Sequence, residues 1–171
     1  MSPESSNKVT LKEVFAEAAA LIKLASEKGV SIGTAESCTG VLIGAAITAI
    51  AGSSQCFTGG IIAYDNFLKT KLLGVPPSTL GKYGSVSEKT AERMAAGARE
   101  RLGVDIAVSV TGIAGPGGGT EEKPVGTVWM GIATKDGVSA VLHEFGDIGR
   151  NKVRDATCFA ALRELKAALG A

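Results

Sequence analysis

The sequence predicts a single α/β domain in which helices cover both faces of a mixed β-sheet, giving three layers. Segments with helical apolar spacing alternate with short β-branched runs along the chain, and a short turn joins the last two runs. Such alternation is typical of parallel strands between helices, and a terminal hairpin adds antiparallel strands. With 171 residues and no internal repeat or linker, the chain is long enough for one domain with its own core.

The composition is that of a folded globular protein. Hydrophobic residues make up 45% of the chain and charged residues 20%, so enough apolar surface is available for a core. The formal net charge is +1, and no basic stripe with interleaved aromatic residues is present. We therefore expect no nucleic-acid partner.

No targeting or membrane segment is recognisable. The longest nearly uncharged run, 38–62, is interrupted by Gly52-Ser53-Ser54-Gln55, and no apolar core follows a basic start as in a signal peptide. We expect a cytoplasmic protein without a membrane partner. The three cysteines, Cys38, Cys56 and Cys158, are widely spaced, which favours reduced thiols. With a single histidine and no Cys-x-x-Cys pair, we expect no zinc site.

The chain is expected to begin with a flexible polar tail, Met1 to Val9, followed by an amphipathic helix. Thr10 and Glu13 have the spacing of a capping box, and apolar residues recur at helical intervals from Leu11 to Ala25. Gly29 is expected to end this helix.

The stretch from Val30 to Ile50 predicts a strand, a turn and a buried helix. A β-branched run precedes the polar turn Glu36-Ser37-Cys38-Thr39, and the apolar segment after the turn is long enough for a helix. Unpaired backbone N–H groups at a helix N-terminus favour an anion or a developing oxyanion, and Ser37 lies at this position. Alternatively, Ser37 or Thr39 only caps the helix.

Four elements are expected in the middle of the chain: a strand over 57–64, a short helix over 67–73, another over 76–83, and a long helix from Ser87 to about Leu102. The pair Gly59-Gly60 indicates a weakened strand interior or a bulge. Asp65-Asn66 is typical of a turn or a helix cap, and Pro76-Pro77 is tolerated in a first helical turn.

The last third predicts a strand, a long loop, a hairpin and a closing helix. The strand 105–111 is mostly apolar, which indicates a central position covered on both faces. The loop from Gly112 to Pro124 has five glycines and two prolines, and a loop of this length is usually functional or disordered. Strands over 125–134 and 138–145 meet at Asp136-Gly137, and the closing helix runs from Gly149 to Leu169.

Three loop segments are expected to meet at the carboxyl ends of the strands, where α/β sheets bind ligands. They are the Ser37 turn, the loop from Thr111 to Pro124, and the helix start at Gly149-Arg150. Neither glycine-rich segment has the Gly-x-x-x-x-Gly-Lys-Ser/Thr or Gly-x-Gly-x-x-Gly spacing, which argues against a nucleotide kinase or a dinucleotide oxidoreductase.

A serine nucleophile needs a base, and the sequence offers two kinds. His143 lies inside a predicted strand, where a structural role explains it equally well, so we assign it no function. Lys69 follows Tyr64 and Asn66 in a short polar segment after a strand, and a lysine kept neutral by burial would serve as the base of a Ser-Lys pair. The alternative is that Lys69 is an ordinary solvated surface lysine.

Six segments together resemble one known family, the C-terminal domain of the competence/damage-inducible protein CinA, which also occurs as a stand-alone nicotinamide-nucleotide amidohydrolase. They are Thr34-Ala35-Glu36-Ser37-Cys38-Thr39-Gly40, Ala51-Gly52-Ser53-Ser54, Gly60 to Tyr64 with Asn66 and Lys69, Val86-Ser87-Glu88, Gly112 to Gly118, and Glu122-Lys123-Pro124-Val125-Gly126-Thr127-Val128. The resemblance extends in order from about Thr10 to the last helix.

This resemblance implies hydrolysis of the carboxamide of nicotinamide mononucleotide to nicotinic acid mononucleotide and ammonia, without metal or other cofactor. It places the nucleophile at Ser37, the lysine at Lys69, the tyrosine at Tyr64 and the basic residue of the last helix at Arg150. It also implies a homodimer or higher homo-oligomer. The N-terminal domain of long CinA proteins has no counterpart here, so we expect no pyrophosphatase activity.

Two departures from the family pattern affect the expected site. The family's glycine pair is Gly40-Val41 here, and the junction 146–149 before Arg150 is one residue longer than usual. The second departure leaves open whether Arg150 or Arg154 binds the substrate phosphate.

The expected mechanism is acyl transfer to Ser37, with Lys69 as base and Tyr64 orienting Lys69 or relaying a proton. The expected oxyanion donors are the backbone N–H groups of Cys38, Thr39 and Gly40. Asn66, Gly112 and Thr111, the last as a hydrogen-bond donor, complete the expected substrate contacts with Arg150 and Arg154. Two alternatives are a non-catalytic nucleotide-binding module linked to DNA uptake or repair, and a serine amidase for another small amide.

Overall fold

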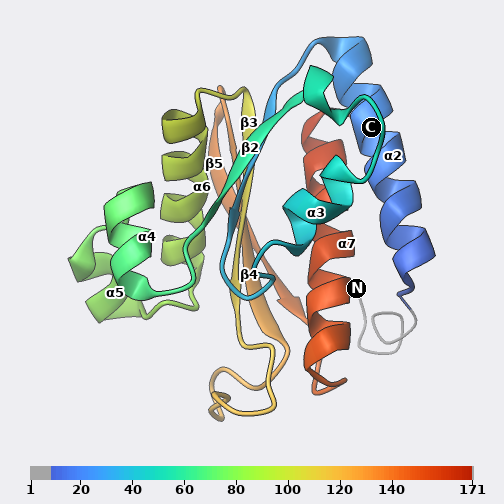
Figure 1. The fold of residues 1–171 in the computed structure, drawn as a ribbon. Helices are drawn as coiled ribbons and strands as arrows, with labels where there is room; N and C mark the ends of the chain where they lie inside the picture. Colours follow the sequence, from blue (N-terminus) through green and yellow to red (C-terminus); the bar gives the residue numbers. More distant parts are fainter. Residues whose placement is uncertain (1–8, 171) are drawn as a thin grey trace.

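The computed structural model describes residues 9–170, and a five-stranded mixed sheet in the order β2-β1-β3-β4-β5 forms its centre (Figure 1). The strands are β1 (Ile32–Glu36), β2 (Phe57–Ile62), β3 (Ile106–Gly112), β4 (Thr127–Thr134) and β5 (Gly137–Glu144). β1 pairs in parallel with both β2 and β3, whereas β4 is antiparallel to β3 and to β5. The predicted mixed α/β sheet is confirmed.

Helices cover both faces of this sheet (Figure 1). One face carries α2 (Leu11–Lys28), α3 (Leu42–Thr48) and α7 (Arg150–Ala168), and the other carries α4 (Asn66–Leu73), α5 (Pro77–Tyr83) and α6 (Glu88–Leu102). A short 3₁₀ turn, Ser53–Gln55, leads into β2. Within residues 9–170, no helix combines the length and apolar character needed to cross a membrane.

The local signals at the helix ends are confirmed. Thr10 and Glu13 form the reciprocal capping box of α2, and Gly29 ends that helix in the left-handed conformation at φ 64°. Asp65 caps α4 and Ser87 caps α6 through their side chains. Because these signals involve residues four or fewer positions apart, the sequence alone carries them.

Other details refine the predicted elements. The register between β1 and β2 shifts next to Gly59, which confirms the bulge alternative. The central strand β3 is buried along nearly all of its length, as expected. Residues 1–8 of the expected tail lie outside the described residues, and Val9 packs against the core instead of belonging to a tail.

Two hydrophobic clusters lie on the opposite faces of the sheet. The larger one, under α2, α3 and α7, contains long side chains such as Leu21, Ile43 and Leu162. The smaller one, under α4 and α6, consists of Ala35, Ala63, Leu73, Val75, Met94, Ala98, Val104 and Ala107. Small residues let α6 approach the sheet closely, and Gly131 of β4 has no room for a Cβ because the Ala91 carbonyl oxygen lies 2.3 Å from that position.

Candidate active site

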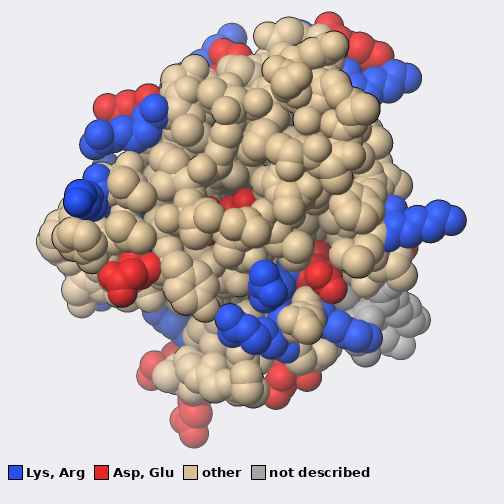
Figure 2. Space-filling model, viewed as in Figure 1, with Lys and Arg blue, Asp and Glu red and all other residues tan. Residues whose placement is uncertain are grey.

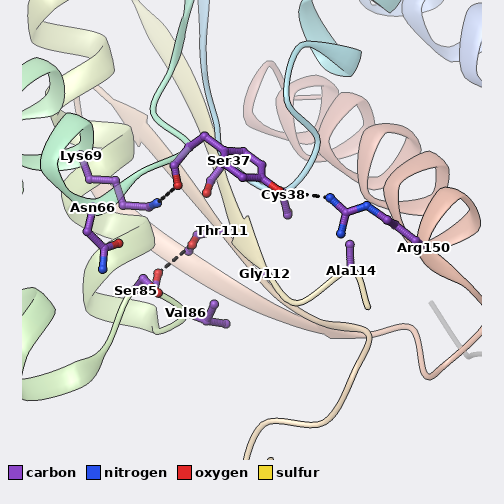
Figure 3. A pocket seen from close by; sticks show the side chains of 11 residues that line it. Ser37, Cys38, Asn66, Lys69, Ser85, Val86, Thr111, Gly112, Ala114 and Arg150 are labelled. Atoms are coloured by element: carbon purple, nitrogen blue, oxygen red, sulfur yellow. Dashed lines mark hydrogen bonds between the residues drawn. The ribbon is translucent and has the colours of Figure 1, made fainter. Parts of the chain in front are cut away.

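A cavity of about 220 Å³ opens beyond the carboxyl ends of β1 and β3 (Figure 3). It is lined by Ser37, Cys38, Tyr64, Asn66, Lys69, Ser85, Val86, Thr111, Gly112, Ala114 and Arg150. Eight of the predicted site residues are in this set, whereas Thr39, Gly40 and Arg154 are not. The parallel strands β1 and β3 thus bring together segments far apart in sequence, as expected for an α/β sheet.

Ser37 directly follows β1 and is almost buried, with 8% of its surface exposed. Its backbone N–H donates to the Val110 carbonyl of β3 at 3.1 Å, which fixes the turn against the central strand. Within the described residues, the Ser37 hydroxyl makes no hydrogen bond, so it is free to meet a ligand in the cavity. The Gly40 N–H donates back to the Ser37 carbonyl at 3.0 Å and is engaged in the turn. Of the three expected oxyanion donors, Cys38 is the one whose residue lines the cavity.

A buried carboxylate, that of Glu36, also holds the Ser37 turn in place. Glu36 is 3% exposed, and its Oε2 accepts hydrogen bonds from the Thr39 hydroxyl at 2.7 Å and the Ile43 N–H at 3.0 Å. Its Oε1 accepts one from the Gly44 N–H at 2.8 Å. Burial raises the pKa of Glu36, although these hydrogen bonds oppose the shift. Glu36 therefore links the end of β1, the Ser37 turn and the start of α3.

The same contacts correct two predictions about α3. The helix begins only at Leu42, and its N-cap, Val41, makes no side-chain cap hydrogen bond. Neither Ser37 nor Thr39 caps it, because Glu36 accepts the N–H groups of the first turn and the Thr39 hydroxyl donates to the same carboxylate. The anion expected at this helix end is therefore a protein carboxylate, Glu36, and not a substrate oxyanion.

Lys69 is buried, so the solvated-surface alternative is wrong. Only 2% of its surface is exposed, and its Nζ donates to the Tyr64 carbonyl at 3.0 Å (Figure 3). Burial lowers the pKa of Lys69, while the negative charge of Asp65 opposes this shift in part. Among the described residues, no carboxylate lines the cavity to hold the lysine in its charged form.

Tyr64 and Arg150 close one side of the cavity. The Arg150 Nη2 donates to the Tyr64 phenol oxygen at 3.1 Å, and its Nη1 donates to the Gly115 carbonyl at 2.8 Å. Tyr64 therefore orients Lys69 through its backbone carbonyl, whereas its phenol contacts Arg150. Both partners of the Arg150 guanidinium are neutral oxygens.

Arg154 lies behind the Ser37 turn, one helical turn beyond Arg150. Its Nη2 donates to the Thr39 carbonyl at 2.8 Å, so it supports the turn instead of facing the cavity. Of the two arginines considered for the phosphate, Arg150 is the one that lines the cavity. A Cβ at Gly40 would lie 3.8 Å from the Arg154 Nη2, so the turn passes close to this side chain.

Three lining residues, Ser85, Val86 and Ala114, were missed by sequence reasoning. The Thr111 hydroxyl donates to the Ser85 carbonyl at 2.7 Å, which draws the segment before α6 to the cavity. Towards a ligand, Thr111 can therefore act only as an acceptor while this bond persists, which differs from the expected donor role. Val86 and Ala114 lie in two of the segments that carry the family resemblance, and this was the available signal.

His143 lies away from Ser37, on β5, beside Ala160, Arg163 and Glu164 of α7. Burial lowers its pKa to about 4, and its ring stacks on Phe145 at 5.4 Å between centroids. Its Nε2 lies 3.7 Å from the Glu164 carboxylate, and His143 shares no cavity with Ser37. A Ser-His pair is excluded by this placement.

The model of the CinA C-terminal domain family matches residues 15–169. The chain belongs to this family. CinA-like proteins of Chlorobaculum tepidum and Synechocystis sp. are 47% and 52% identical over 94% and 84% of the chain. The chain spans only 38% and 35% of their lengths, about a third.

Solved structures of the CinA superfamily share the fold. The competence/damage inducible protein CihA from Agrobacterium tumefaciens is 44% identical, with a TM-score of 0.89 over 93% of this chain and 96% of that one. A superfamily protein from Escherichia coli is 29% identical, with a TM-score of 0.87 over 95% and 96%. The predicted family is confirmed, and these two structures share the fold over 93% and 95% of this chain.

Proposed function

We propose that this domain is a metal-independent serine amidohydrolase that converts nicotinamide mononucleotide to nicotinic acid mononucleotide and ammonia. The observation that carries the proposal is the convergence of Ser37, the buried Lys69 and Arg150 on one cavity. A module that only binds a nucleotide needs a cation for the phosphate, but it has no use for a buried lysine beside a free hydroxyl. Family membership supports the same reaction class.

In the proposed reaction, neutral Lys69 accepts the hydroxyl proton of Ser37 while the Ser37 Oγ attacks the carboxamide carbon. The C–N bond of the tetrahedral intermediate then breaks, and the Lys69 ammonium returns the proton to the departing nitrogen, which leaves as ammonia. A water molecule then gives a proton to Lys69 and attacks the acyl-enzyme ester, and the Lys69 ammonium returns that proton to the departing Ser37 Oγ, which releases the carboxylic acid and regenerates Ser37. The lowered pKa of Lys69 suits both proton transfers.

The oxyanion of each tetrahedral intermediate would be stabilised by the Cys38 N–H group, the expected donor whose residue lines the cavity. One well-placed donor of this kind contributes about 3 kcal/mol to the transition state in comparable sites. Glu36 and Arg154, which bind the hydroxyl and the carbonyl of Thr39, hold the turn that carries this N–H group in position before substrate arrives.

The phosphate of the substrate would pair with Arg150 in a charge-assisted contact. Arg150 is the first residue of α7, whose N-cap Gly149 makes no side-chain cap bond and whose first turn holds no acidic residue. The helix dipole therefore adds positive potential at this end. Several Lys and Arg side chains lie together on the lower part of the face seen in Figure 2, close to where α7 begins in Figure 1.

The proposal is tested by measuring ammonia release from nicotinamide mononucleotide in the presence of a metal chelator. We expect turnover in the wild type and a loss of at least about 10³-fold in Ser37→Ala and in Lys69→Ala. The matched controls are Ser54→Ala and Lys71→Ala, which alter exposed residues outside the cavity and should keep wild-type rates.

Two other outcomes would replace the proposal. Ser37-dependent ammonia release from a different amide, with none from nicotinamide mononucleotide, would indicate a serine amidase for another substrate. Nucleotide binding without Ser37-dependent turnover of any amide tested would indicate a binding module.

A further inference from the structure

A second groove extends the catalytic cavity away from Ser37 and Lys69. It has a volume of about 430 Å³ and runs between the segment 84–86 and the glycine-rich loop. It shares Ser85, Val86, Gly112, Ala114 and Arg150 with the catalytic cavity, and Lys123 lines it as well. Among the described residues that line it, none is acidic.

Lys123 is a partly buried cation whose only described partner is neutral. Its Nζ donates to the carbonyl of Tyr83, the last residue of α5, at 3.1 Å. No carboxylate in residues 9–170 forms an ion pair with it, and the same is true of Arg150. A partly desolvated cation next to a neutral carbonyl gains by exchanging that carbonyl for an anion.

We propose that Lys123 is a second ligand for the phosphate monoester of the substrate, opposite Arg150. The phosphate then lies in the groove outside the catalytic cavity, and the ribose spans the opening towards Ser37. On anion binding, the Lys123 amine exchanges the Tyr83 carbonyl oxygen for a phosphate oxygen. The Tyr83 carbonyl then accepts a hydrogen bond from water. The identity of the substrate rests on the proposed function, whereas the anion site can be tested without it.

The loop that carries Lys123 does not depend on its amine. The Lys123 N–H donates to the Thr120 hydroxyl at 3.0 Å, and the Thr120 N–H donates to the Lys123 carbonyl at 2.9 Å. These two bonds close a turn through the backbone. Replacing the Lys123 side chain by glutamine should therefore leave the loop folded while removing the charge.

The first experiment compares nicotinamide mononucleotide with nicotinamide riboside, which lacks the phosphate. For Lys123→Gln we expect KM for the mononucleotide to rise by about tenfold with little change in kcat, and no change for the riboside. Lys123→Arg should restore most of the loss, and Lys135→Gln, an exposed lysine in the β4–β5 turn, should behave as the wild type. An equal effect on both substrates, or no effect on either, would overturn the inference.

The second experiment measures binding of ribose 5-phosphate and of ribose by calorimetry, without catalysis. We expect ribose 5-phosphate to bind the wild type at least about tenfold more tightly than Lys123→Gln, with an affinity that falls as salt is added. This result in a protein that hydrolyses no amide would retain the phosphate groove and reject the amidohydrolase. Amide turnover together with an unchanged affinity of Lys123→Gln for ribose 5-phosphate would retain the amidohydrolase and reject the phosphate groove.

Discussion

Ser37 and Lys69 face the same cavity, but the protein holds them in different ways. The Ser37 turn is fixed by charged groups, Glu36 on one side and Arg154 on the other. Within residues 9–170, the Lys69 amine donates a hydrogen bond only to a neutral carbonyl, and its helix is positioned by close packing of α4 against α6. The difference follows from chemistry, because a carboxylate hydrogen-bonded to Lys69 would add to the effect of Asp65 and raise the pKa of the base further, whereas a charge behind the turn leaves the serine hydroxyl unaffected.

The largest effect is expected where backbone packing positions Lys69. A Cβ at Gly97 of α6 would lie 1.8 Å from the carbonyl oxygen of Leu73, the last residue of α4. We expect Gly97→Ala to reduce the free energy of unfolding by about 3 kcal/mol, because α4 must move away from α6. Urea unfolding measures this loss, and ammonia release should fall with it.

The matched control for this change is Gly81→Ala in α5. A Cβ there meets nothing within 4 Å, so alanine should stabilise the protein by about 0.5–1 kcal/mol. Equal stability of Gly97→Ala and the wild type would show that the α4–α6 contact does not fix the lysine.

On the Ser37 side, Glu36→Gln should reduce both stability and turnover. The amide group keeps one acceptor oxygen but turns its NH₂ towards a backbone or hydroxyl donor, which costs about 1–3 kcal/mol of unfolding free energy. Because the turn loses its support, we expect kcat to fall while the exposed control Glu100→Gln remains unchanged. Unaltered unfolding midpoints and rates in both variants would contradict the role given to Glu36.

Lys69→Met should abolish turnover yet stabilise the fold at neutral pH, by on the order of 1 kcal/mol. The pKa of Lys69 is lower in the folded state than in the unfolded state. At pH values below the folded-state pKa, the charged buried amine therefore destabilises the folded state. The penalty declines as the pH rises from the folded pKa towards the unfolded one. The stability gained by Lys69→Met should therefore be larger at pH 7 than at pH 9.5.

Urea unfolding of the wild type and Lys69→Met at both pH values checks this sign. Lys71→Met alters an exposed lysine on the same helix and should show no such pH dependence. A gain that increases towards high pH would be inconsistent with a lysine whose pKa is lowered by burial.

The smallest effect concerns the position of the pH profile. The charge of Asp65 raises the pKa of Lys69, so Asp65→Asn should lower it further. The acidic limb of the kcat/KM profile then shifts to lower pH, since Lys69 must be neutral to act as base. Asparagine is also a good N-cap, so α4 is preserved. The exposed control Asp136→Asn should leave the profile in place, and a shift to higher pH would refute the assignment.

The features of this structure that depend on residues close together in the sequence could be predicted from the sequence. The caps at Thr10, Asp65 and Ser87 and the alternation of elements are local, and the ends of β1 and β3 converge by the general rule for parallel strands. Together with the family resemblance, these features placed Ser37, Lys69 and Arg150 in one site.

The rest depends on contacts that no local pattern encodes. The start of α3 was misplaced because a strand residue, Glu36, caps it from outside the helix, and the small residues after Ser37 fit a helical pattern equally well. The role of Arg154 depends on its contact with Thr39, which lies 115 positions earlier. Burial of Lys69 likewise results from the packing of α4 against α6, which sequence periodicity does not reveal.

A cavity without carboxylates has a consequence for the end of the proposed catalytic cycle. The acid product carries a carboxylate that the amide substrate lacks, and protonated Lys69 is a cation in the same cavity that can pair with it. The product is then bound more tightly as the pH falls, while the fraction of Lys69 that is neutral decreases. Inhibition by nicotinic acid mononucleotide should therefore strengthen in acid, and the enzyme would slow itself when the surrounding solution acidifies.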